Sequence, residues 1–157
     1  MRKNKLIFAF GLWSMVFGLW SAAYAQNSGP QAPPVDIAIS APDNAVVGAM
    51  IPVTIKVTPS VDMHADISCL LPQGIMPVPE QGVRIMPYHP RGIPNIERIK
   101  QYRLIVNLWV GPMKANETKE FTFHVKAAQK GSYSLICVVQ ALAKWGEKEG
   151  SLTLNVN

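Results

Sequence analysis

The chain has 157 residues and a formal net charge of +5, from 15 basic and 10 acidic residues. This length fits one compact domain that can bury its core without a metal or many crosslinks. Arg2, Lys3 and Lys5 account for three of the basic residues, and the remaining 12 basic and 10 acidic residues give the rest of the chain only +2. Such a small excess excludes the strongly basic class of nucleic-acid-binding domains.

The first 25 residues have the composition of a signal peptide. The three basic residues precede an apolar run over residues 6–19, and Ala23-Tyr24-Ala25 has small residues where a signal peptidase reads them. We expect cleavage before Gln26, since the polar, Pro-rich residues that follow cannot continue a helix. The alternative is an uncleaved anchor, because the apolar stretch from 6 to 23 can just span a bilayer.

The chain is thus divided into a signal peptide at 1–25, a Pro-rich linker at 26–34 and a domain at 35–157. Export makes the mature protein periplasmic or secreted, and we expect no stable membrane insertion after the leader is cleaved. A formal charge near neutrality gives no support to a nucleic-acid partner.

Apolar and polar residues alternate through the first half of the domain, which is the period of β-strands. Strands are predicted at 35–40, 51–57 and 64–71, with prolines marking the turns that follow. The stretch from 72 to 95 contains six prolines and three glycines, which predicts a long, stiff loop with one short strand at 83–86.

Alternation returns in the second half, at 99–110, 121–125, 133–141 and 152–156. In the first of these strands, one predicted face consists of Tyr102, Leu104, Val106, Leu108 and Val110, and Gly111-Pro112 is expected to end it. The strand at 133–141 is apolar on both faces, as a central strand would be. The sequence therefore predicts an all-β sandwich of seven to eight strands.

Cys69 and Cys137 both fall on positions predicted to point inward. An even number of cysteines in an oxidising compartment favours a disulfide between them, closing a loop of about 69 residues. The alternative is a pair of buried free thiols.

Four short motifs give the chain a family resemblance. They are Leu-Trp-Val-Gly-Pro-Met at 108–113, Glu-Thr-Lys-Glu-Phe-Thr-Phe at 117–123, Lys-Gly-Ser-Tyr-Ser-Leu at 130–135 and Leu-Leu-Pro-Gln-Gly-Ile at 70–75. Together they resemble bacterial immunoglobulin-like domains related to the CARDB, or cell-adhesion-related, domains. The resemblance implies an immunoglobulin-like β-sandwich that serves as a spacer or binding module. Members of that family usually occur in tandem and lack a basic, Pro-rich insertion.

Catalysis has little support in the sequence. None of the three histidines, His64, His89 and His124, accompanies a nucleophile motif such as Gly-x-Ser-x-Gly. Asp62, His64 and Asp66 form the nearest approach to an acid–base cluster, and a solvated strand end explains them equally well. We expect no enzymatic activity and no cofactor. The alternative is a periplasmic copper-handling protein, because an exported chain with thioether and imidazole groups can bind copper. Its candidate ligands are Met63, His64, Met86 and His89.

Binding is the function that these observations favour. The stretch from 80 to 103 carries five basic and two acidic residues, and its prolines reduce the entropy lost on docking. Tyr, Met and Arg are enriched in interface cores. The predicted partner-binding residues are Arg84, Met86, Tyr88, His89, Arg91 and Arg98. Trp109 and Trp145 would widen this surface if they faced outward.

We therefore expect an exported, noncatalytic interaction or assembly module of the bacterial envelope. It would bind a protein partner through the Pro-rich basic loop, or by adding a partner's strand to a sheet edge. Two alternatives stay open: a loop that folds over its own sandwich with its arginines solvated, and an envelope chaperone with transient partners.

Overall fold

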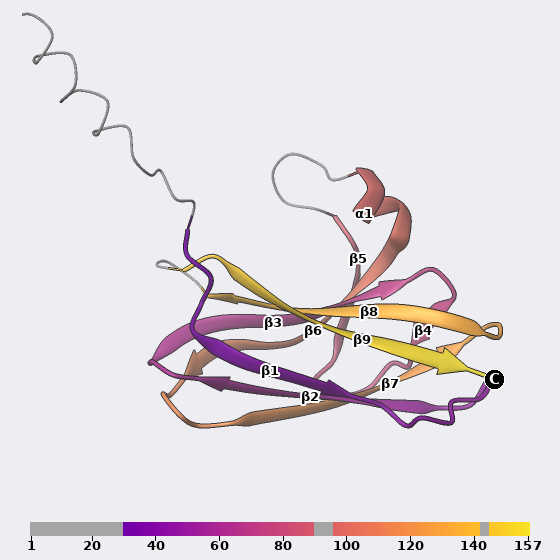
Figure 1. Ribbon diagram of the computed structural model, residues 1–157, viewed down its shortest axis with the longest axis horizontal. Coiled ribbons are helices and arrows are strands. Elements are labelled where there is room, and N and C mark those ends of the chain that lie inside the picture. Colours follow the sequence, from indigo (N-terminus) through magenta and orange to yellow (C-terminus); the bar gives the residue numbers. More distant parts are fainter. Residues whose placement is uncertain (1–29, 90–95, 142–144) are drawn as a thin grey trace, which may run out of the picture.

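The alternating strands stack as two antiparallel sheets in the computed structural model, which describes residues 30–89, 96–141 and 145–157 (Figure 1). The predicted leader at 1–25 lies outside the described residues. Residues 30–34 of the predicted linker are attached to the sandwich: Ser60 N donates to Pro34 O (2.9 Å) and Gly146 N to Gln31 O (2.8 Å). Among the described residues, no helix is long and apolar enough to cross a bilayer.

The first sheet has the strand order β1-β2-β7-β4, and the second has the order β5-β6-β3-β8-β9. The elements are β1 Val35–Ser40, β2 Ile51–Pro59, β3 Met63–Pro72, β4 Ile75–Pro77, β5 Arg84–Pro87, α1 Ile96–Gln101, β6 Tyr102–Met113, β7 Lys119–Ala127, β8 Gly131–Ala141 and β9 Glu147–Val156. The all-β sandwich prediction is confirmed. The described residues contain nine strands rather than seven to eight, because β4 was expected to be loop.

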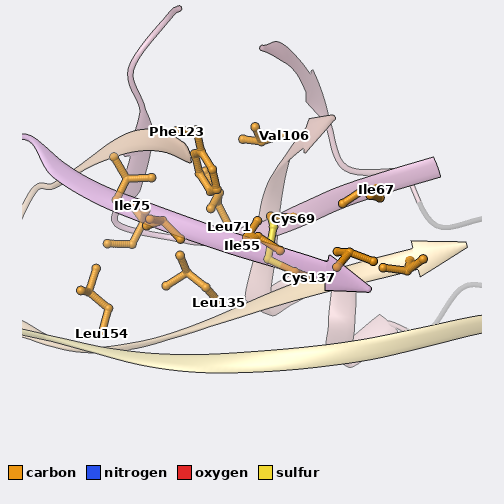
Figure 2. Packing of buried hydrophobic residues seen from close by; sticks show 14 of the residues in the cluster. Ile55, Ile67, Cys69, Leu71, Ile75, Val106, Phe123, Leu135, Cys137 and Leu154 are labelled. Atoms are coloured by element: carbon orange, nitrogen blue, oxygen red, sulfur yellow. A yellow bond between two sulfur atoms is a disulfide. The ribbon is translucent and has the colours of Figure 1, made fainter. Parts of the chain in front are cut away.

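The core lies between the sheets and is built from the inward positions of the alternating strands (Figure 2). Ile55 and Phe123 come from the neighbouring strands β2 and β7, while Ile67, Leu71 and Leu135 come from the other sheet, and all five side chains are fully buried. This two-faced burial explains why the sequence shows a period of two and no long helical period.

Cys69 of β3 and Cys137 of β8 are joined by a disulfide inside the second sheet (Figure 2). The two residues lie directly opposite each other in the β3–β8 register, with their Cα atoms 4.1 Å apart. Both are fully buried. The bond therefore links neighbouring strands of one sheet and does not connect the two sheets.

The strand expected at 99–110 is partly helical. Residues 96–101 form α1, with Glu97 in its first turn and Arg98 and Lys100 in its last, an arrangement that suits the helix dipole. β6 then runs through Gly111-Pro112 to Met113, so those two residues do not end the strand.

A β-bulge in β6 reverses the predicted faces of its second half. Ser68 pairs with Asn107 and Ile67 pairs with Trp109, so Leu108 is the extra residue. Trp109 consequently turns toward the core, and Val110, which the alternation placed on the same face as Val106, is 56% exposed.

The Pro-rich segment supplies edge strands to both sheets. β4 pairs with β7 and β5 pairs with β6, each at the outside of its sheet. Pro77 and Pro87 lie in these two strands, and proline is tolerated there because an edge residue need not donate to a second neighbour. The segment is therefore not one continuous loop.

Candidate functional site

The end of the Pro-rich segment forms the edge strand β5, and the chain then reaches helix α1 on the outer side of the second sheet. We call residues 84–89 and 96–101 the β5–α1 ridge. Helix α1 leads into β6, yet Arg98 forms an ion pair with Glu149 of β9. The strands β3 and β8 lie between β6 and β9, a span of about 14 Å. The helix with its side chain must therefore lie over the outer face of these strands, and Figure 1 shows α1 on the side of the second sheet away from β1 and β2.

The Arg98–Glu149 pair fastens the ridge. Burial alone would lower the pKa of Arg98, but the hydrogen bond and the charge of Glu149, with smaller contributions from Tyr88 and Glu147, raise the pKa above its ordinary value. Arg98 is therefore always charged. Its side chain is about a quarter exposed, so the charge is held close to its partner and is screened less than a surface charge.

A small apolar row crosses the outer face of the second sheet, starting from Met86 in the ridge. In register across the strands, Met86 lies opposite Ile105, Ile105 opposite Leu70, and Leu70 opposite Ile136. Leu70 is only 2% exposed although it is not part of the main core cluster. Ile136 and Val138, the outward apolar residues of the central strand β8, are half-buried on this face.

The ridge keeps two of the predicted partner-binding residues at the surface. Arg84 and His89 are exposed, and His89 Nδ1 lies 3.1 Å from the carbonyl of Pro87. Met86 and Tyr88 are half-buried, and the backbone N–H of Tyr88 donates to Arg103 O (3.0 Å). Arg91 lies outside the described residues.

Arg98 was expected to contact a partner, but its guanidinium forms an ion pair with Glu149 of the same chain. Glu149, which fixes the ridge, and Arg103, which is exposed beside it, were not among the predicted partner-binding residues. Arg103 does belong to the basic stretch from 80 to 103, but no local signal connects Arg98 to a carboxylate 51 residues away.

The candidate copper ligands are not brought together. His64 lies opposite Pro112 on β6, whereas Met86 lies opposite Ile105, a separation of seven residues or about 23 Å along the strand. Met63 is buried beside His64, and His89 follows Met86. Within the described part of the chain, no group of three or more His, Cys, Asp or Glu side chains could hold a metal ion.

The two aspartates near His64 have structural partners. Asp62 accepts a hydrogen bond from the backbone N–H of Ala115, and Asp66 accepts one from Asn107 Nδ2, each at 2.8 Å. These bonds hold the turn after β6 and a cross-strand pair. Asp62 precedes β3, His64 is exposed near the start of this strand, and Asp66 is half-buried within it.

The tryptophans do not extend the ridge. Trp109 packs against Phe121 of the facing sheet, with ring centroids 6.2 Å apart, and Lys119 Nζ lies 4.4 Å from the centre of a Trp109 ring. Trp145 is half-buried against the core.

Comparisons with known proteins identify the fold. No protein-family model matches the sequence, and a search of curated proteins finds no match. Among solved structures, the chain is similar to the CARDB domain of a Pyrococcus furiosus protein solved in complex with di-metal ions. That likeness has a TM-score of 0.50 at 13% identity and covers 84% of this chain and 95% of the other.

A second similar structure is the native conformation of Escherichia coli alpha-2-macroglobulin, with a TM-score of 0.54 at 10% identity. The likeness covers 79% of this chain but only 7% of that much larger one. Identities this low concern the fold alone. The described residues of this chain thus form a bacterial-type immunoglobulin-like β-sandwich, the fold of the CARDB domain.

Proposed function

We propose that the protein is an exported, noncatalytic interaction module of the bacterial envelope and that it binds a protein partner through the β5–α1 ridge. The observation that carries the proposal is the construction of the ridge. A domain of this fold closes its core with two sheets, and here an additional segment is fastened over one sheet by the Arg98–Glu149 pair. Such a segment forms a raised, ordered surface whose docking costs little conformational entropy.

The chemistry of the ridge favours a partner with acidic groups. Arg84 and Arg103 are exposed on neighbouring strands, and His89 is exposed at the end of β5. Half-buried Met86 and Tyr88 add the apolar and aromatic surface that interface cores use. We include Arg91 in the contact surface on its sequence position, and we assign Arg98 to holding the ridge in place.

Export is supported by the leader-like first 25 residues and by the disulfide. Disulfides form and persist in oxidising compartments, which fits a periplasmic or secreted domain. The Ala23-Tyr24-Ala25 pattern and the polar residues after it support cleavage of the leader and a mature chain that begins near Gln26.

Native mass spectrometry of the protein, purified gently from the envelope fraction, tests this function. The expected spectrum contains the cleaved chain together with a stoichiometric second subunit. The charge reversal Arg84→Glu should remove that subunit, whereas Lys114→Glu, the same charge change in the exposed turn after β6, should retain it. A lone mature chain that carries copper, or an identical loss of the subunit in both variants, would contradict the proposal.

A further inference from the structure

One end of the sandwich carries an apolar surface that the proposed function does not use. Four large side chains are exposed there: Val46 by 55%, Val47 by 37%, Met50 by 53% and Met76 by 57%. Three of them lie in the connection between β1 and β2, and Met76 lies in β4. We call these four residues the apolar tip. Exposed large apolar groups gathered in one place mark an interaction surface more often than isolated ones do.

The tip is continuous across three segments of the chain. Gly48 N donates to Ala127 O (3.0 Å) at the end of β7, and Met76 lies opposite Lys126 of the same strand. Met50 directly precedes Ile51, which pairs with Val125 on the other side of β7. Met50 and Met76 therefore flank Lys126, one on each neighbouring segment.

Three backbone N–H groups of the turn have acceptors within the domain. Ala49 N donates to Val46 O (3.1 Å), and Gly48 takes the positive φ of 74° that this tight turn requires. Val47 N donates to Asn157 O (3.4 Å) and Gly48 N to Ala127 O. Pairing these N–H groups lowers the cost of moving the turn into an apolar medium, where an unpaired polar group is expensive.

Two lysines lie beside the tip. Lys126 and Lys130 are exposed, and neither belongs to an ion pair within the described residues. The connection itself carries one charged side chain, that of the exposed Asp43, and none from Asn44 to Ile51. Apolar side chains that point outward beside free lysines are the arrangement that docks on anionic lipid, since the lysine stems reach to the headgroups while the apolar groups enter the interface.

We propose that the apolar tip docks this domain on the surface of an anionic phospholipid bilayer. Val46, Val47 and Met50 enter the interfacial region from the turn, Met76 joins them from β4, and Lys126 and Lys130 contact the lipid phosphates. This docking is peripheral and reversible, because one turn buries far less apolar surface than a membrane-spanning helix does. It goes beyond the proposed protein-binding function and uses a different part of the molecule.

Vesicle sedimentation tests the proposal with exported protein whose mass shows that residues 1–25 have been removed. One set of vesicles contains equal amounts of phosphatidylglycerol and phosphatidylcholine, and the other contains phosphatidylcholine alone. The protein should bind the first set and lose binding with added salt. The double variant Val47→Asp, Met50→Ser should bind at least about tenfold more weakly, and Lys126→Gln with Lys130→Gln should lower binding to the anionic vesicles several-fold.

Val110→Ser is the matched control, because Val110 is exposed by 56% but lies on β6 of the other sheet. Its binding should equal that of the unchanged protein. The proposal is overturned if the unchanged protein stays in the supernatant when the anionic vesicles are sedimented. It is equally overturned if the tip variants and Val110→Ser bind these vesicles equally well. It is also overturned if the unchanged protein forms dimers that Val47→Asp abolishes, since the tip would then bind a second copy of the chain.

Discussion

Arg98 of α1 reaches Glu149 of β9 across two intervening strands of the second sheet. This ion pair is the connection that converts a Pro-rich segment into a ridge. Its contribution to the free energy of unfolding can be compared with that of the Lys100–Glu97 pair. That pair is exposed, lies within the same helix and has a nitrogen–oxygen distance of 3.1 Å.

Replacing Arg98 with Met should lower the free energy of unfolding by about 1 kcal/mol, because the pair is partly buried and is also a hydrogen bond. Lys100→Met should change it by less than about 0.5 kcal/mol, as is usual for an exposed helix pair. Urea unfolding measures both values. Equal effects of the two substitutions would show that the pair with Glu149 does not hold the ridge.

The contribution of Arg98 should not depend on pH from neutrality to mildly alkaline conditions. Its pKa in the folded protein is raised above its ordinary value, so its stabilisation is fully present below that ordinary value and is lost only as the pH rises through the raised pKa. The difference in unfolding free energy between Arg98→Met and the unchanged protein should therefore be the same at about pH 7 and about pH 9. A difference that shrinks over this interval would contradict the assignment.

Gly74 and Gly82 provide a second matched pair. Both have positive φ, 95° and 83°, but a Cβ at Gly74 would lie 2.9 Å from the Tyr133 ring, whereas a Cβ at Gly82 would meet nothing within 4 Å. Gly82→Ala should cost about 1 kcal/mol for the backbone alone, and Gly74→Ala about 2–3 kcal/mol because the ring must also move. The midpoints of urea unfolding measure the stability of the two variants. Equal midpoints for Gly74→Ala and Gly82→Ala would show that the Tyr133 ring does not pack on Gly74.

Loss of the disulfide should destabilise the domain substantially. The bond joins residues 68 positions apart, so it restricts the unfolded chain strongly, and the double variant Cys69→Ala, Cys137→Ala should lose about 2–4 kcal/mol. Thiol alkylation of the denatured, unreduced protein provides the chemical check, since a bonded pair does not react. Two alkylated cysteines in exported protein would favour the free-thiol alternative.

The sequence predicted several strands of the core because one face of each is more buried than the other. β2 shows this most clearly: Val53, Ile55 and Val57 are buried, while Thr54, Lys56 and Thr58, which alternate with them, are not. The pairing of the cysteines could be suggested because the chain contains only two. Neither inference required knowledge of contacts distant in sequence.

Local patterns failed where a distant partner decides the structure. The bulge at Leu108 shifts β6 by one residue relative to β3, and no signal within β6 itself marks that shift. β4 has three residues and includes a proline, so only its pairing with β7 makes it a strand. The same reason hid the ridge, since Arg98 is fastened by a residue in the last strand.

Site-specific photo-crosslinking in the native envelope tests the central claim most directly. A photoreactive residue replaces Arg84 on the ridge in one variant and Lys114, which is also exposed but lies in the turn after β6, in the other. A protein that binds its partner through the ridge should give one discrete crosslinked species from position 84 and none from position 114. The absence of a crosslink at position 84, or the same species from both positions, would contradict the assignment of the ridge as the binding surface.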